Sequence, residues 1–295
     1  GNSRCDVYWN NELAQTIRLK RKGYLQPYVS PSAATIPAGF KDAEGYWTGF
    51  AARARVIIYN TDEISEDEVP KSLQAMKDPK WDGKMGMAKP LTGTTLTHAA
   101  ALFATWGEKE TKNFYRDVLR RDVRWEAGNA MVMAKVGQGN YAWGYTDTDD
   151  ANVSRIKGRK TEIIVPDQGK DEIGTLLIPN SVAIIKGARN LAAARLLVDF
   201  LLRPETEALL AKGRSAQIPL HPGVDAPKEV LRLEEIKAME VDWERMAEML
   251  ETHDDWLQET FEPQEADGKK FLYFGLGALA LVVVIVLLRG LRRKD

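Results

Sequence analysis

The sequence predicts an α/β protein with two lobes and a C-terminal transmembrane helix. Three observations support this prediction. Short apolar strands alternate with amphipathic helices over most of the chain, which is typical of α/β domains. The chain has 295 residues, which is long for one core and sufficient for two lobes. An uninterrupted apolar run at residues 271–288 is near the lower limit for spanning a ~30 Å hydrocarbon layer.

The composition and the cysteine and histidine content exclude several kinds of site. Acidic residues number 42 and basic residues 41, so the chain lacks the positive charge that nucleic-acid binding requires. The single cysteine, Cys5, cannot form a disulfide within the chain, and we expect it to be a small buried hydrophobic residue. A histidine zinc site is not predicted, because no carboxylate or cysteine stands at metal-ligand spacing from His98, His221 or His253.

The first predicted strand and helix have polar residues between them. Residues 7–9 read as a strand and residues 12–22 as a helix. Asn10, Asn11 and Glu12 therefore stand at the carboxyl end of a strand, where open α/β sheets place their ligands. Capping of the helix by one of the asparagines is the alternative.

Residues 49–60 end in a strongly β-branched strand, in which Arg53 and Arg55 alternate with small residues. Both guanidinium groups then lie on one face of the strand. Each needs an opposing carboxylate, which either the protein or a ligand must supply. The run of Pro, Trp and Gly within residues 78–87 marks a boundary at which we expect the second lobe to begin.

A turn rich in threonine follows a strand predicted at residues 85–88 and precedes a helix predicted at residues 96–106. Free backbone N–H groups and hydroxyls converge at such a helix N-terminus, where the helix dipole favours an anion. Capping by a single threonine is the alternative. The lysine of a phosphate-binding loop is missing from this motif, so nucleotide hydrolysis is not predicted. The residues of this turn assigned to the site are Thr92, Gly93, Thr94 and Thr95.

A second polar helix start follows further along the chain. An amphipathic helix at residues 111–121 and a strand at residues 123–126 lead to Asn129, which opens a helix at residues 130–136. The next predicted strand, residues 139–145, runs directly into an acidic turn. We expect the two helix starts and this turn to share one cleft.

The acidic turn places three carboxylates within four positions. Like charges at this spacing repel, and burial without partners would raise their pKa values. We therefore expect them to face water, a cation, or hydroxyl and amine donors. A solvated turn in which Asp149 caps a short helix is the alternative. The residues assigned to the site here are Thr146, Asp147, Asp149 and Asp150.

The remaining predicted strands and helices lie between residues 162 and 261, whereas residues 24–37 read as an irregular connection. A polar break at residues 179–181 interrupts a strand predicted at residues 174–185, which indicates a hinge crossing and adds Asn180 to the predicted site. The other predicted elements are a strand at 162–166, helices at 190–202 and 204–212, an extended piece at 217–220 and a mostly helical acidic segment at 231–261.

The apolar run is expected to cross a membrane after a linker at residues 263–270. A helix that is apolar on every face and has basic flanks suits lipid better than a protein core, which is the alternative. The larger basic cluster follows the run, so the positive-inside rule places residues 289–295 in the cytoplasm and the preceding domain outside. Because the chain begins without an initiator methionine and just before a strand, we expect a further segment upstream.

Five segments, taken in order, resemble a known family. They are CDVYWNNE from Cys5, GFAARARVIIYNT from Gly49, the turn at 90–95, GYTDTDDA from Gly144 and GTLLIPNSVAIIKGARN from Gly174. Their order and spacing resemble the ferric-ion type of periplasmic solute-binding protein of ABC importers, truncated at its N-terminus. The resemblance implies a type II periplasmic-binding fold, in which two lobes joined by hinge strands close over a ligand, and it implies a permease partner.

The same resemblance assigns roles to individual positions. The family's anion-binding helix turn falls at residues 92–94, its second polar helix start at Asn129, and its acidic ligand from the first lobe at Asn11 or Glu12. Ferric binders of this family carry adjacent tyrosines where this chain has Thr148-Asp149-Asp150, and phenolates are what fix Fe³⁺ there. A phosphorylated or phosphonate ligand is therefore one expectation. Ferric iron with an anion is the other, with Asp149 and Asp150 as possible metal ligands.

The sequence thus predicts a binding protein and not an enzyme, with no cofactor other than Fe³⁺ as a possible transported ligand. Two alternatives remain. Asp147-Thr148-Asp149 superficially matches the nucleophile motif of haloacid-dehalogenase phosphatases, and a membrane-tethered sensor domain of the same fold is the other. The predicted lobes are residues 1–80 with 176–225, and residues 81–175 with 226–262.

Overall fold

The computed structural model describes residues 4–262. They divide into two compact units between Asp254 and Asp255, and helix α8 (Trp243–Phe261) crosses this division. Within the described residues, no helix is both long enough and apolar enough to cross a membrane. The linker predicted at 263–270 and the transmembrane helix predicted at 271–288 lie outside the described residues.

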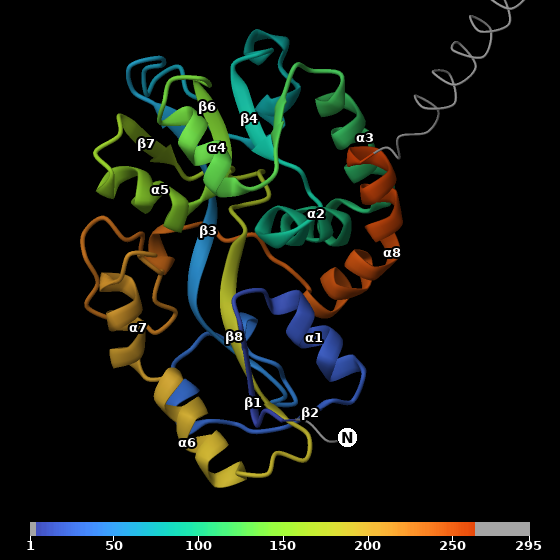
Figure 1. Cartoon of the computed structure of the whole chain (residues 1–295), viewed down its shortest axis with the longest axis vertical. Helices are drawn as coiled ribbons and strands as arrows, with labels where there is room; N and C mark the ends of the chain where they lie inside the picture. The colour runs from blue at the N-terminus through green and yellow to red at the C-terminus, as the bar shows by residue number, and fades with distance from the viewer. Residues whose placement is uncertain (1–3, 263–295) are drawn as a thin grey trace, which may run out of the picture. The chain divides into compact units, whose positions relative to one another are not determined.

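One long strand connects two groups of strands. Strand β3 (Thr48–Asn60) is buried at all 13 of its residues. Its first half pairs with β8 (Leu177–Ile185), and from Arg55 onward it pairs with β6 (Trp143–Asp147) and β7 (Thr161–Ile164). The strand order is β1-β8-β3-β6-β4-β5, with β2 on β8 and β7 on β3. Figure 1 shows β3 running through both groups.

The first group, here called the β8 group, contains β1 (Val7–Asn10), β2 (Leu25–Gln26), β8 and the first half of β3, all antiparallel. Helices α1 (Leu13–Arg21), α6 (Leu191–Leu201) and α7 (Pro204–Lys212) accompany it. The buried residues of α6 are spaced by three or four positions, so one face of the helix is covered. This face joins a core that includes Phe50, Leu202 and Ile218.

The second group, here called the β6 group, contains β4 (Met85–Ala88), β5 (Arg124–Glu126), β6, β7 and the second half of β3. Strands β5, β4 and β6 run parallel. They lead into α2 (Gly93–Trp106), α4 (Asn129–Val136) and α5 (Thr148–Ile156), while α3 (Glu108–Leu119) follows α2. Because the three strands are parallel, the N-termini of α2, α4 and α5 lie at one edge of the group.

Short 3₁₀ helices complete the secondary structure, and most of the predicted elements are confirmed. The strand predicted at 85–88 and the helix predicted at 204–212 have the predicted bounds. Helix α2 begins at Gly93, three residues before the predicted start. The 3₁₀ helices are Pro31–Ala33, Ala38–Phe40, Leu73–Lys77, Pro79–Trp81 and Leu233–Glu235.

The predicted break at residues 179–181 is wrong, because β8 continues through it. Pro179 has no N–H to donate, and the irregularity that accommodates it lies on the partner strand. There the register of β3 shifts between Phe50 and Ala52, and Ala51 has a φ of 42°. Asn180 donates its side-chain N–H to the Ala51 carbonyl, which supplies a hydrogen bond to the irregular strand.

The helix predicted from residue 231 begins only at Trp243. Residues 237–239 instead pair with Thr175 through backbone hydrogen bonds of 2.9 Å. This long-range pairing satisfies the same N–H and C=O groups that a helix would have used, so the helical pattern of the sequence is overridden. The prediction that Cys5 is buried is also wrong. Cys5 is exposed, because it precedes the first residue of β1.

Candidate ligand-binding site

The predicted site residues from α2, α4 and β6 meet around one buried carboxylate. Asp147 is the last residue of β6, and its Oδ1 accepts a hydrogen bond of 2.6 Å from Arg55 Nη1. Its Oδ2 accepts from Thr94 Oγ1 at 2.5 Å and from Asn129 Nδ2 at 3.1 Å. Arg55 is fully buried, and Asp147 is 4% exposed. The sequence predicted crowded carboxylates in the acidic turn. One of them, the carboxylate of Asp147, is paired with a cation and two neutral donors.

The threonine turn is engaged by the protein's own groups. Thr94 Oγ1 also accepts from Asn129 Nδ2 at 2.6 Å, and Thr95 Oγ1 donates to Asn129 Oδ1 at 3.1 Å. Arg55 approaches both hydroxyls, at 3.3 Å and 3.4 Å. Thr92 occupies the N-cap position of α2, but its side chain caps no N–H group among the described residues. The simple capping alternative is therefore not what the turn does, and Thr92 and Gly93 are exposed.

Asp149 and Asp150 lie in the first turn of α5, partly buried. Burial, and then the charges of Asp149 and Asp147, raise the pKa of Asp150 to about 7, although Thr146 Oγ1 donates a hydrogen bond of 3.0 Å to it. Burial and the charge of Asp147 likewise raise the pKa of Asp149. The helix N-cap is Asp147, so the alternative in which Asp149 caps a helix is wrong.

These three aspartates form a candidate cation site. One carboxylate oxygen from each of Asp147, Asp149 and Asp150 lies within 4.8 Å of the other two. Asp149 Oδ1 is buried and has no hydrogen-bond partner among residues 4–262. A buried carboxylate oxygen without a donor is costly, and a hard cation with oxygen ligands would relieve this cost.

Glu12, which follows β1 of the β8 group, also lies close to the buried Asp147 carboxylate and its arginine partners. Its Oε2 accepts a 2.6 Å hydrogen bond from Thr97 Oγ1 of α2, and its Oε1 lies 3.4 Å from Arg53 Nη2. Arg53 also donates to the Asn11 carbonyl, and its Nε lies 4.0 Å from Asp147 Oδ2. Burial raises the pKa of Glu12. The sequence left open which carboxylates face the arginines of β3. In the structure they are Glu12 from the β8 group and Asp147 from the β6 group.

Two predicted site residues have other roles in this structure. Asn10 donates to Tyr8 Oη at 3.1 Å and to the Glu12 carbonyl at 2.9 Å, which holds the turn between β1 and α1. Asn180 donates to the backbone at the β3 bulge and to Gln217 Oε1 at 3.0 Å. Sequence reasoning missed Thr97. Its signal was its spacing, one helical turn after Thr94 on α2.

The nearby tyrosines are poorly suited to act as phenolate ligands. Tyr145 is buried between His98, whose ring centroid is 5.5 Å away, and the Arg55 guanidinium, 5.1 Å from the Tyr145 ring centroid. Burial raises the pKa of the Tyr145 phenol well above its ordinary value, and it also raises the pKa of Tyr8. A phenol must lose its proton to bind a metal as phenolate, so both shifts oppose this role.

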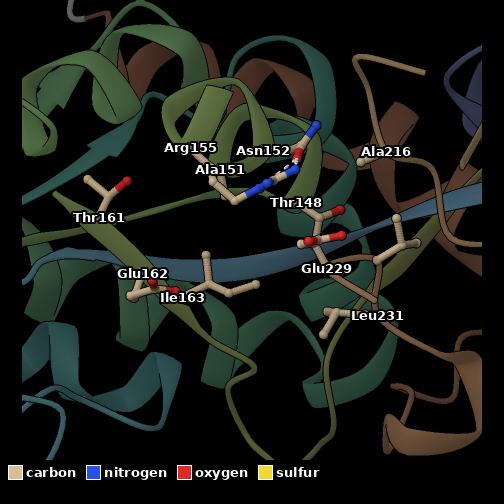
Figure 2. A pocket seen from close by; sticks show the side chains of 11 residues that line it. Thr148, Ala151, Asn152, Arg155, Thr161, Glu162, Ile163, Ala216, Glu229 and Leu231 are labelled. Carbon is tan, nitrogen blue, oxygen red and sulfur yellow. Dashed lines mark hydrogen bonds between the residues drawn. The ribbon is translucent and has the colours of Figure 1, made fainter. Parts of the chain in front are cut away.

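A crevice lies on another face of α5. It has a volume of about 260 Å³ and separates α5 and β7 from residues 216 and 229–231 (Figure 2). Asn152 accepts hydrogen bonds of 3.2 Å and 2.8 Å from Arg155 and donates one of 2.8 Å to the Arg214 carbonyl. The crevice lining is a different set from the predicted site residues: Thr148, Ala151, Asn152, Arg155, Thr161, Glu162, Ile163, Ala216, Glu229, Val230 and Leu231.

Comparison with known proteins assigns the chain to a family. Residues 16–249, more than half of the chain, match the model of the bacterial extracellular solute-binding proteins. The chain is 26% identical to iron uptake protein A2 of Synechocystis sp. over 235 residues, 76% of this chain and 67% of that protein. The structure of iron-bound HitA from Pseudomonas aeruginosa aligns with a TM-score of 0.77 and 23% identity, covering 86% of this chain and 83% of HitA.

A second solved structure has a different ligand. It is AfuA from Actinobacillus pleuropneumoniae with fructose-6-phosphate bound, which aligns with a TM-score of 0.75 and 21% identity over 89% of this chain and 84% of AfuA. Together these alignments show a two-lobe α/β fold of the periplasmic binding protein kind. The match over residues 16–249 shows that this chain belongs to the family of bacterial extracellular solute-binding proteins.

Proposed function

We propose that this protein is the solute-binding component of an ABC importer and that it captures a metal cation, ferric iron in the first instance. The observation that carries the proposal is the group of carboxylate oxygens from Asp147, Asp149 and Asp150, which lie within 4.8 Å of one another. The relative with 26% identity is an iron uptake protein, which supports the choice of iron.

The charges around the site favour a cation. Four carboxylates, those of Glu12, Asp147, Asp149 and Asp150, surround two guanidinium groups, Arg53 and Arg55. Burial raises the pKa values of Glu12, Asp149 and Asp150, so their ionised forms are disfavoured until a positive charge joins them. Carboxylate oxygens are hard ligands, which suits Fe³⁺.

A phosphorylated organic anion is the second candidate. The observation that favours it is the likeness in fold to AfuA with fructose-6-phosphate, together with the polar helix starts at Thr94 and Asn129. The hydroxyl of Thr94 and the amide of Asn129 are both directed at Asp147 in this structure, which favours the cation as the first candidate.

Further parts of the proposal concern the whole protein. We place it on the outer face of the membrane, anchored by residues 271–288, with a permease as partner. We also propose that the two lobes meet within β3, where the strand changes partners after Ala54. We also propose a binding role without catalysis, because the chain belongs to a family of solute-binding proteins. The phosphatase alternative would need Asp147 as its nucleophile, but both oxygens of this carboxylate accept hydrogen bonds, from Arg55 and from Thr94.

The test is metal and ligand binding by the full chain. Titration calorimetry with ferric citrate, Mg²⁺ and glucose 6-phosphate should give one tight site for iron and none for the sugar phosphate. Ferric binding should produce no visible phenolate charge-transfer band, because carboxylates supply the ligands. Asp149→Asn should weaken iron binding at least tenfold, whereas the exposed Asp171→Asn should not change it. Equal iron affinity in the wild type and Asp149→Asn would exclude this site.

A further inference from the structure

Three elements build a cradle of the kind that binds anions. The guanidinium of Arg55 comes from β3, the hydroxyl of Thr94 from the first turn of α2, and the amide of Asn129 from the start of α4. All three donate to the two oxygens of one carboxylate, at 2.6, 2.5 and 3.1 Å. A buried cation, a hydroxyl and an amide at helix N-termini are the donors that usually hold a phosphate or a similar oxoanion.

The anion in this cradle belongs to the protein itself. Asp147 reaches it from the junction of β6 and α5, and it is 4% exposed. Its charge cancels that of Arg55, and it uses the donors that an external anion would need. Nε of Arg55 and Nε of Arg53 are buried without hydrogen-bond partners among the residues that the structure describes, so unused donor capacity remains around the carboxylate.

The surroundings add to the exclusion of anions. Glu12, Asp149 and Asp150 all interact electrostatically with Asp147 or with the arginines that face it. An external anion that entered the occupied cradle would therefore meet three further carboxylates and a guanidinium that is already neutralised.

We propose that Asp147 is a built-in anion, which occupies the cradle of Arg55, Thr94 and Asn129 and makes the protein select ligands without an anionic group at this position. The inference rests on the proposed function in one respect, namely that the ligand binds next to Asp147. It predicts that removal of the Asp147 charge converts the cradle into a site for a small oxoanion, because the buried Arg55 is then left without a counter-ion.

The experiment is phosphate binding by full-length variants at neutral pH, with inorganic phosphate as the probe. Asp147→Ala should bind phosphate at least tenfold more tightly than the wild type, and phosphate should raise its unfolding temperature. The gain should disappear in Asp147→Ala combined with Arg55→Met, since the cation of the cradle is then gone. Folded Asp147→Ala without any gain would overturn the proposal.

Two controls separate the cradle from net charge and from misfolding. Asp149→Asn removes the same charge two positions away and outside the cradle, so an equal gain of phosphate binding in that variant would also overturn the proposal. The wild type needs no substitution: its unfolding temperature should respond to phosphate only as it responds to chloride at equal ionic strength. Saturable stabilisation of the wild type by phosphate would contradict a filled cradle even if both Asp147 variants fail to fold.

Failure of this proposal is distinguishable from failure of the proposed function. Iron binding is read on the wild type, whereas the cradle is read from phosphate binding by Asp147→Ala. If the wild type binds no metal, the proposed function fails, but the phosphate result for Asp147→Ala still stands. If the wild type binds metal, the cradle proposal still depends on phosphate binding by Asp147→Ala.

Discussion

The pair of Arg55 and Asp147 places opposite charges side by side in a buried part of the protein. Both side chains are at most 5% exposed, and the distance between Arg55 Nη1 and Asp147 Oδ1 is 2.6 Å. A buried ion pair contributes little net stability, but removal of one partner leaves an uncompensated buried charge. Loss of either residue should therefore cost more stability than loss of one partner of an exposed ion pair.

Arg55→Met should lower the free energy of unfolding by about 3–5 kcal/mol, because Asp147 would remain charged and buried. Urea denaturation followed by circular dichroism measures this loss. The matched control is Arg116→Met on the exposed face of α3, which should change stability by about 0.5 kcal/mol or less. A loss in Arg55→Met no larger than the control would mean that water or a counter-ion reaches Asp147.

The raised pKa of Asp150 predicts opposite pH effects on stability and on metal binding. Its pKa rises from 3.8 in the unfolded chain to about 7 in the fold. The folded state therefore holds the proton more tightly, so this group makes the protein less stable as pH rises from about 4 to 7. A metal needs the ionised carboxylate, so metal affinity should rise through the same interval.

Iron or gallium titrations at several pH values check the second effect. Asp150→Asn should flatten the affinity profile around pH 7 and also the fall of the unfolding free energy with pH. Glu12 and Asp149, whose pKa values are also raised, will keep a residual slope. An unchanged profile in Asp150→Asn would assign the titration to those two groups.

At the scale of single residues, the sequence predicted which side chains lie close together better than it predicted their hydrogen-bond partners. Asp147 and Thr94 were assigned because each follows a strand, and this placement requires only local patterns. Their contact with each other and with Arg55 joins positions 39 to 92 residues apart, which no local pattern encodes. The burial of Cys5 and the break at residues 179–181 were misjudged for the same reason, since burial and bulge geometry depend on the partner strand.

At the scale of elements, the bulge in β3 is fixed by a carboxylate from α7. Glu207 is fully buried, and its Oε1 accepts from the Ala51 N–H at 2.7 Å. Its Oε2 accepts from the N–H groups of Leu220 and His221 at 2.9 and 2.8 Å. One side chain therefore satisfies three N–H groups that no strand partner reaches.

Glu207→Gln should destabilise the protein by about 1–3 kcal/mol, because an amide has one acceptor oxygen and would present its NH₂ to an N–H group. Thermal unfolding measures the loss, and hydrogen exchange should be faster at Ala51, Leu220 and His221. Glu205→Gln, on the exposed side of the same helix, is the control. Equal protection of the three amides in both variants would show that Glu207 does not fix the bulge.

Helix and strand positions were largely readable from the sequence, and the exceptions have physical causes. The parallel strands β4 and β6 end in polar turns, so both the strand and the helix start were visible. The stretch from 231 to 242 has the composition of a helix, but residues 237–239 pair with Thr175 instead, and only the short 3₁₀ helix Leu233–Glu235 forms before them. Pro179 looked like a break, because the compensating bulge is on β3.

At the scale of the first compact unit, α5 and the segment after α7 face each other across the crevice of Figure 2. The hydrogen bond from Asn152 to the Arg214 carbonyl, 2.8 Å long, spans this gap. Asn152 lines this crevice and is not one of the three clustered aspartates, so the contact links α5 to the segment after α7 through a residue outside the proposed ligand site.

Asn152→Ala should weaken ligand binding by about 0.5–1.5 kcal/mol, the net value of one hydrogen bond, if lobe closure forms this contact. Most of the change should appear as faster ligand release in stopped-flow measurements. Lys157→Ala, at the exposed C-terminal end of α5, is the control. Unchanged release in Asn152→Ala would show that the crevice keeps its width when ligand leaves.

The continuity of β3 has a thermodynamic consequence. Its 13 buried residues supply a central strand to both groups, so neither group can lose β3 without exposing its own core. The groups should therefore melt together: differential scanning calorimetry of the ligand-free protein should give one endotherm whose calorimetric and van't Hoff enthalpies agree. Two resolved endotherms would mean that the halves of β3 separate at Ala54 and behave as independent cooperative units.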